Sequence, residues 1–159
     1  MSGELEIERK YLLHDLPPDL DTSNGKDIQQ GYLCLEDGRH VRVRTKGSKF
    51  FLTVKVGEGI VRTEYEAEIS KEQFDVFWPA TEGRRLEKVR HIYPLEQYEM
   101  EIDVYAGDLA PLVVAEVEFP SISASDEFVP PAFVSEEVSG NPLFSNIRLA
   151  LEGLKNFAK

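Results

Sequence analysis

The sequence has very little cysteine and no long apolar run. Its single cysteine, Cys34, excludes an internal disulfide framework, and without a His/Cys cluster nearby it makes neither a zinc site nor a redox pair. No stretch approaches the roughly 18 apolar residues of a membrane span, and charged residues alternate through positions 4 to 10, where a signal peptide would be apolar. We therefore expect a cytoplasmic protein with no membrane partner, in which Cys34 packs as a small hydrophobic residue.

Basic residues are absent from one third of the chain. The 159 residues carry 18 Lys+Arg against 29 Asp+Glu, a formal net charge of −11. Residues 91 to 147 contain 11 acidic residues and no Lys or Arg, whereas residues 39 to 90 contain 12 basic and 8 acidic residues. As a bulk quantity, this charge argues against nucleic acid and other polyanions as partners. Because no Pro/Gly/Ser-rich linker separates the two parts, we predict a single domain over residues 1–159.

Alternation of apolar and polar residues predicts a mainly β protein, built as an antiparallel sheet or barrel. Turn residues occur at short intervals between the alternating segments, and Asp37-Gly38 is a favoured two-residue hairpin turn. About eight strands are predicted, over residues 4–13, 29–36, 39–46, 50–56, 60–69, 86–93, 97–105 and 112–120.

Two helices are predicted beside the strands. Ser70 followed by Gln73 is a capping box, and the helix that it begins ends before Pro79. Asn141-Pro142 provides an N-cap and a proline at the first helical position for a C-terminal helix. The apolar stripe of that helix consists of Leu143, Ile147, Ala150, Leu151 and Leu154.

One face of several strands carries charges of a single sign. Arg42, Arg44 and Lys46 share a face of one strand, and Glu101 and Asp103 share a face of another. For one strand, a solvated face is the simplest interpretation. The pattern recurs on several strands, however, and like charges two residues apart repel each other. A ligand that carries both signs of charge would explain the repetition.

A closed sheet with these faces inward would bring cations and carboxylates into one lumen. Such a set would cost several kcal/mol per ion to bury without water, so the lumen has to be wet or occupied. Arg binds phosphate oxygens bidentately and Lys acts as a point charge, whereas Mg²⁺ or Mn²⁺ takes one or two carboxylates together with water and phosphate. The pattern therefore indicates a site for a metal ion and a polyphosphate.

Seven short charged elements follow one another along the chain. They are Glu6-Ile7-Glu8-Arg9-Lys10, Arg42-Val43-Arg44, Lys55, Glu64-Tyr65-Glu66, Lys88-Val89-Arg90, Glu101-Ile102-Asp103 and Glu116-Val117-Glu118. In this order they resemble the CYTH domain, or triphosphate tunnel metalloenzyme, family over about residues 4 to 155. The chain is most similar to the short bacterial inorganic tripolyphosphatases of that family. The resemblance implies a closed eight-stranded antiparallel β-barrel, the triphosphate tunnel, with short helices that include a C-terminal plug helix.

The resemblance also implies an activity and the residues that perform it. The activity is metal-dependent hydrolysis of inorganic tripolyphosphate to pyrophosphate and phosphate, with one or two Mg²⁺ or Mn²⁺ ions as cofactor. The implied substrate-binding residues are Lys10, Arg42, Arg44, Lys55, Lys88 and Arg90. The implied metal ligands are Glu6, Glu8, Glu116 and Glu118, and the implied catalytic residues are Glu64, Glu66, Lys88 and Asp103.

Several alternatives stay open at this point. The same tunnel could act on an organic triphosphate such as thiamine triphosphate or ATP, as a hydrolase or a cyclase, or it could bind polyphosphate or nucleotides without catalysis. A lipocalin-like barrel for an apolar ligand is disfavoured by the charged lumen. The sequence also leaves open the physiological substrate, the preferred metal and whether two barrels form a homodimer.

Some residues outside the charged elements also carry expectations. His14, His40 and His91 are predicted to lie on the surface or at the rim. The apolar residues Phe128, Pro130, Pro131 and Phe133 could form a dimer contact, but a packed loop is the favoured interpretation.

Overall fold

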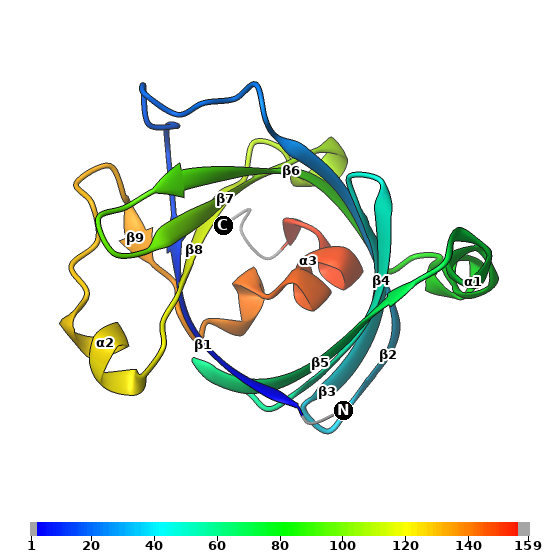
Figure 1. The fold of residues 1–159 in the computed structure, drawn as a ribbon. Helices are drawn as coiled ribbons and strands as arrows, with labels where there is room; N and C mark the ends of the chain where they lie inside the picture. The colour runs from blue at the N-terminus through cyan, green and yellow to red at the C-terminus, as the bar shows by residue number, and fades with distance from the viewer. Residues whose placement is uncertain (1–2, 156–159) are drawn as a thin grey trace.

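Antiparallel strands close into a ring in the computed structural model of the protein, which describes residues 3–155 (Figure 1). Neighbouring strands follow the order β5-β4-β3-β2-β6-β7-β8-β1, and β1 pairs back onto β5. The closed eight-stranded antiparallel barrel implied by the sequence is therefore confirmed. Its strands are β1 (Glu4–Leu12), β2 (Lys26–Glu36), β3 (Arg39–Lys46), β4 (Lys49–Val56), β5 (Val61–Ile69), β6 (Arg85–Pro94), β7 (Glu99–Tyr105) and β8 (Val113–Glu118).

The first strand closes the ring. Residues Glu4–Ile7 of β1 pair with β5, and residues Glu8–Leu12 pair with β8 on the other side. Beyond the part of β1 that pairs with β5, a ninth strand, β9 (Glu136–Glu137), pairs with the last two residues of β1. The sequence does not predict β9, because two exposed residues are too short a segment to show a periodicity.

The turn between β2 and β3 forms as predicted. Asp37 and Gly38 both adopt positive φ, at 48° and 70°, which is the requirement of the two-residue turn that matches the twist of a hairpin. Further along β2, a register shift between Tyr32 and Cys34 marks a β-bulge. The prediction that Cys34 is packed was wrong, because this residue is exposed where the bulge interrupts the alternation of β2.

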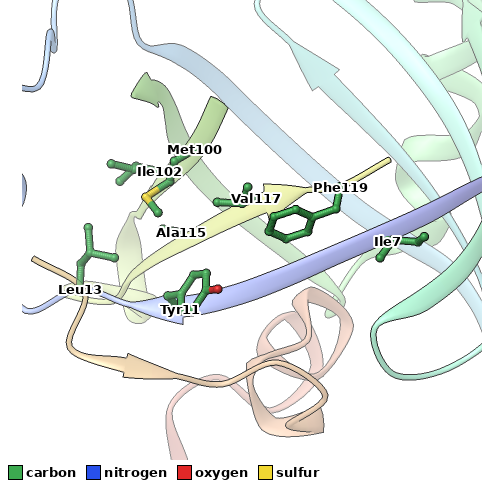
Figure 2. Packing of buried hydrophobic residues seen from close by; sticks show 8 residues of the cluster. All are labelled: Ile7, Tyr11, Leu13, Met100, Ile102, Ala115, Val117 and Phe119. Carbon is green, nitrogen blue, oxygen red and sulfur yellow. The ribbon is translucent and has the colours of Figure 1, made fainter. Parts of the chain in front are cut away.

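The larger apolar core lies outside the barrel. It covers the outer face of β1, β7 and β8 (Figure 2), where Tyr11, Ile102 and Val117 are fully buried. Phe128 and Phe133 pack against this cluster from the segment that contains α2 (Ile122–Glu127), so the packed loop is confirmed. The outward faces of these strands are apolar because their inward faces are charged, and the covering segment removes that apolar surface from water.

A second apolar cluster holds the C-terminal segment against the ring. Leu149 of α3 (Asn146–Glu152) packs with Leu86, Tyr105 and Val114 from three strands, and Figure 1 shows α3 within the outline of the ring. The predicted plug helix is confirmed, but it consists of two pieces. Leu151 of its predicted apolar stripe is exposed, and Leu149 is buried instead. Asn141 caps the 3₁₀-helix η3 (Pro142–Phe144), and Ser145 then starts α3 with a new side-chain cap.

The remaining helices are short. Ser70 and Gln73 form both bonds of the predicted capping box at α1 (Lys71–Phe77), which continues into the 3₁₀-helix η1 (Trp78–Thr81). A further 3₁₀-helix, η2 (Gly107–Leu109), precedes β8. Among residues 3–155, no helix is both long and apolar enough to cross a bilayer.

We expect the Ile102→Ala variant to lower the free energy of unfolding by about 2–5 kcal/mol, because it removes a fully buried side chain and leaves a cavity in the cluster of Figure 2. Urea denaturation followed by circular dichroism measures the change. Val129→Ala is the control, since Val129 is 82% exposed and its truncation should change stability by less than about 0.5 kcal/mol. Equal effects of the two variants would contradict a core on the outer face of the barrel.

Candidate active site

A cavity of about 170 Å³, which we call the tunnel cavity, lies in the lumen of the barrel and is lined by all eight of its strands. Successive strand residues point to opposite faces, so the residues that line this space come from the inward face of each strand. Seven cations line it: Lys10, Arg42, Arg44, Lys46, Lys55, Arg62 and Arg90. Six carboxylates join them: Glu6, Glu8, Glu64, Glu101, Glu116 and Glu118. Tyr32, His40, Ser145 and Asn146 complete the lining.

The structure brings together most of the residues that the sequence singles out. The predicted residues that line the tunnel cavity are Lys10, Arg42, Arg44, Lys55, Arg90, Glu6, Glu8, Glu64, Glu116 and Glu118. Three others, Lys88, Glu66 and Asp103, are bonded to neighbouring side chains and do not line it. Of these three, Glu66 accepts hydrogen bonds from Arg44 at 3.2 Å and from the Thr53 hydroxyl at 2.7 Å.

Ion pairs link the charged side chains across neighbouring strands. The Lys55 ammonium lies 3.0 Å from a Glu6 oxygen and 3.3 Å from a Glu64 oxygen. Lys10 pairs with Glu116 at 3.4 Å. A buried ion left without a partner would destabilise the fold strongly, so these pairs account for how the lumen tolerates so many charges. A polyanion that enters would compete with the carboxylates for the same cations.

A fully buried group of charges lies beside the tunnel cavity. The two oxygens of Asp103 accept bonds from Lys88 Nζ at 2.7 Å, from Arg90 Nε at 2.7 Å and from Arg90 Nη2 at 2.8 Å. Although burial opposes ionisation, Lys88 and Arg90 hold the pKa of Asp103 below its usual value. Burial lowers the pKa of Lys88 to about 8, against the attraction of Asp103. The bonds of Asp103 therefore serve to fix Arg90, which does line the tunnel cavity.

Two carboxyl groups of the tunnel cavity bind protons unusually tightly. Burial and the neighbouring Glu116 raise the pKa of Glu8 to about 8. Burial, with Glu6 and Glu8 nearby, raises the pKa of Glu118 to about 7. Glu116 is the opposite case, because Lys10 and Arg90 outweigh burial and hold its pKa well below the usual value. The pKa of Glu8 is raised even though Arg62 lies 3.5 Å from one of its oxygens, because burial is the larger effect.

A second cavity, of about 320 Å³, adjoins the tunnel cavity. It lies between the β2–β3 turn at Gly38, the β4–β5 turn at Gly57 and Gly59, and the segment 138–148 that leads into the plug. Apolar side chains such as Leu35 and Ile147 contribute to its lining. The residues that it shares with the tunnel cavity are Glu8, Lys10, His40, Arg62 and Ser145. We call it the side cavity.

The chain that forms this charged, closed antiparallel barrel is clearly similar in sequence to known proteins. The family model of the CYTH domain matches residues 4–142. The chain belongs to the CYTH domain family. An inorganic triphosphatase of Nitrosomonas europaea is 42% identical over 148 residues, which cover 92% of this chain and 97% of that protein. An inorganic triphosphatase of Acetivibrio thermocellus is 35% identical over 156 residues, which cover 96% and 97% of the two chains.

The fold agrees with a solved member of the family. The crystal structure of an inorganic triphosphatase matches this CYTH domain with a TM-score of 0.68 and 41% sequence identity. The match covers 92% of this chain and 94% of that chain. Triphosphate tunnel enzymes of the CYTH family are metal-dependent.

The carboxylates of this CYTH domain have the donor chemistry that a hard divalent cation requires. Glu6, Glu8, Glu116 and Glu118 line one cavity, and after burial the neighbouring carboxylates contribute to the raised pKa values of Glu8 and Glu118. Within the part of the chain that the structure describes, no three His, Cys, Asp or Glu side chains are grouped as metal ligands. Mg²⁺ is commonly bound by one or two carboxylates together with water and phosphate oxygens, and these glutamates offer such oxygen donors.

His40 lines the CYTH lumen but is not among the site residues that the sequence predicts. His40 is half-buried, lines both cavities and has a buried Nδ1 with no hydrogen-bond partner among the described residues. Burial, together with Lys55, Arg42 and Arg62, lowers its pKa to about 4, so the imidazole is neutral at pH 7. His40 lies on the same face of β3 as Arg42 and Arg44, and this alternation could have identified it from the sequence. Of the other histidines, His14 is exposed as predicted, whereas the prediction for His91 was wrong, because this residue is buried on β6.

We expect the Glu8→Gln variant to melt several degrees above the wild type at pH 9 in EDTA. An acid whose pKa rises from 4.5 to about 8 on folding binds more protons in the folded state, so stability falls as the pH rises through this window. The substitution removes that loss, and 1 kcal/mol corresponds to about 2–4 °C in Tm. At pH 4.5 or below, where Glu8 is protonated in the folded state, the two proteins should melt within about 2 °C of each other. Thermal melts by circular dichroism measure both values.

Glu137→Gln is a control for which we expect the opposite change in Tm. Arg9 donates two hydrogen bonds to Glu137, at 2.7 and 2.8 Å, and these lower the pKa of that carboxyl. Its contribution to stability is present above its unfolded pKa and is lost as the pH falls, so its replacement should lower Tm at pH 9. If Glu8→Gln also lowered Tm at pH 9, the interpretation that folding raises the pKa of Glu8 would be wrong.

Proposed function

We propose that this protein hydrolyses inorganic tripolyphosphate to pyrophosphate and phosphate inside the tunnel cavity, with one or two Mg²⁺ or Mn²⁺ ions. The observation that carries the proposal is the set of seven cationic side chains, from five strands, that line one lumen of a CYTH domain. Linear triphosphate resists hydrolysis largely because its negative charge repels a nucleophile, so neutralisation of that charge is the main catalytic contribution of such a site.

The cations bind the substrate by exchanging partners. Arg42 and Arg44 are buried on β3, and their guanidinium groups are suited to bidentate contacts with phosphate oxygens. Lys10 and Lys55 are held by carboxylates at 3.0 to 3.4 Å, and phosphate oxygens replace those carboxylates when the substrate enters. The carboxylates released in this way become available to a cation that enters with the substrate.

The metal is assigned to Glu6, Glu8, Glu116 and Glu118. When bound, it supplies positive charge to the phosphate oxygens and lowers the pKa of a bound water. Glu64, which lines the tunnel cavity, is the acid that we assign to orient an attacking water. Glu66 was implied to share this role, but its bonds to Arg44 and Thr53 favour a positioning role in which it holds Arg44. Lys88 and Asp103 were implied to be catalytic, but their mutual bond favours a positioning role in which they hold Arg90 against the substrate.

An organic triphosphate is the second candidate substrate. The side cavity adjoins the triphosphate site and combines apolar residues, such as Leu35 and Ile147, with polar ones. A base or a thiazolium group attached to the triphosphate would need a pocket of this kind. Hydrolysis rates with tripolyphosphate, ATP and thiamine triphosphate separate the two candidates, and we expect the rate to be highest with tripolyphosphate.

We expect phosphate release from tripolyphosphate to require Mg²⁺ or Mn²⁺ and to stop when EDTA is added. Glu8→Gln should lose most of the activity while keeping the circular dichroism spectrum of the folded barrel, because it removes a proposed metal ligand. A colorimetric phosphate assay measures both effects. Turnover that continues in EDTA would refute the metal-dependent mechanism, and tight binding of tripolyphosphate without turnover would favour a binding module.

We expect Arg44→Ala to raise the KM for tripolyphosphate at least about tenfold, because one charge-assisted contact with phosphate is worth about 1.5–3 kcal/mol. Arg39→Ala is the matched control. Arg39 lies on the same strand but is exposed and does not line the tunnel cavity, so its KM should match the wild type. If both variants changed KM equally, general electrostatic attraction would replace the specific contact as the explanation.

A further inference from the structure

The junction between η3 and α3 places a neutral side chain at the plugged end of the tunnel cavity. Ser145 and Asn146 line this cavity, and among residues 3–155 no other residue of the C-terminal segment from β9 onward does so. Asn146 is the first residue of α3, and it reaches the lumen from a segment more than 50 residues beyond β6, the last strand that contributes a cation to the lining. The plug therefore contributes polar groups to the site in addition to closing it.

Hydrogen bonds to two strands fix this junction. Lys10 Nζ donates to the carbonyl oxygen of Phe144 at 3.1 Å. The Tyr105 hydroxyl donates to Asn146 Oδ1. Tyr105 itself is buried beside Lys88. The Lys10 bond holds the backbone of the junction and the Tyr105 bond holds the Asn146 side chain, so Asn146 is preorganised and loses little freedom when a ligand binds.

The two polar side chains of the junction, Ser145 and Asn146, differ in which of their hydrogen-bonding groups already have a partner. The Ser145 hydroxyl is engaged, because it donates to the Pro142 carbonyl at 2.8 Å and accepts from the Arg148 amide at 3.3 Å. Asn146 uses only its oxygen, and its Nδ2 donates to no described residue. Burial raises the pKa of Tyr105 well above its usual value, which keeps its hydroxyl protonated as the donor and leaves the Asn146 amino group as the free end.

We propose that Asn146 is a substrate-binding residue whose Nδ2 donates a hydrogen bond to the terminal phosphate of the triphosphate at the plugged end of the tunnel. This inference rests on the proposed function. Lys10 lies beside the same end of the cavity and supplies the charge, while the amide supplies a directional donor without a further cation to desolvate. Tyr105 is the positioning residue that orients the amide.

The test compares two substitutions at position 146. Asn146→Ala removes the donor and the acceptor, and Asn146→Asp keeps an oxygen for Tyr105 but replaces the donor with a negative charge. We expect KM for tripolyphosphate to rise about tenfold in Asn146→Ala, the loss typical of one hydrogen bond to a charged group. The rise should be larger in Asn146→Asp, because the carboxylate repels the phosphate. Phosphate release measures KM and kcat, and calorimetry with tripolyphosphate in EDTA measures binding without turnover.

Asn141→Ala is the matched control. Asn141 belongs to the same plug and accepts from the Leu143 amide, but it lines only the side cavity. A weakened plug would therefore raise KM in Asn141→Ala as well, whereas the proposed contact predicts an unchanged KM there.

The outcomes distinguish a contact between Asn146 and the substrate from a structural role of Asn146 in the plug. Near-wild-type binding in Asn146→Asp would overturn the proposal, since a purely structural bond to Tyr105 survives that substitution. Equal losses in Asn141→Ala and Asn146→Ala would overturn it in favour of plug stability. A wild-type protein that binds tripolyphosphate but does not hydrolyse it would refute the proposed function alone, because the calorimetric comparison of the variants would still test Asn146.

Discussion

Cross-strand pairing of opposite charges is the interaction on which the rest of the structure depends. Several lumen pairs join residues that lie directly opposite each other in the strand register: Lys10 with Glu116, Lys55 with Glu64 and Arg90 with Asp103. Slippage by one residue would turn every inward side chain to the outer face and leave its partner buried without a counter-charge. The alternation that builds the barrel therefore also specifies its register.

A charged interior requires the protein to bury its apolar surface elsewhere. The larger core lies on the outer face of β1, β7 and β8 (Figure 2), and residues of the segment that carries α2 pack against it. At the plugged end, inward positions change from charged to apolar, and Leu86 and Val114 hold Leu149 of α3. The barrel is thus stabilised from outside and at one end, which leaves the middle of the lumen free for solvent and ligand.

The lumen differs electrostatically from the chain as a whole. The formal net charge of the sequence is −11, whereas the seven cations and six carboxylates of the tunnel cavity sum to +1. The excess of acid that argued against a polyanionic ligand therefore lies outside the tunnel cavity. A divalent cation bound at the carboxylates would make the lumen more positive still and favour a triphosphate further.

The sequence by itself determined the strands, the charged inward faces and most of the candidate site, because side-chain alternation along a strand is a local property. It could not determine how deep each side chain lies along the axis of the barrel. Lys88 and Asp103 have the predicted parity but bond to each other outside the lining of the tunnel cavity, and the bulge at Cys34 breaks the parity of β2. Only the tertiary structure brings Asn146 into the lumen, because strand stagger and the docking of the plug depend on packing between segments far apart in the chain.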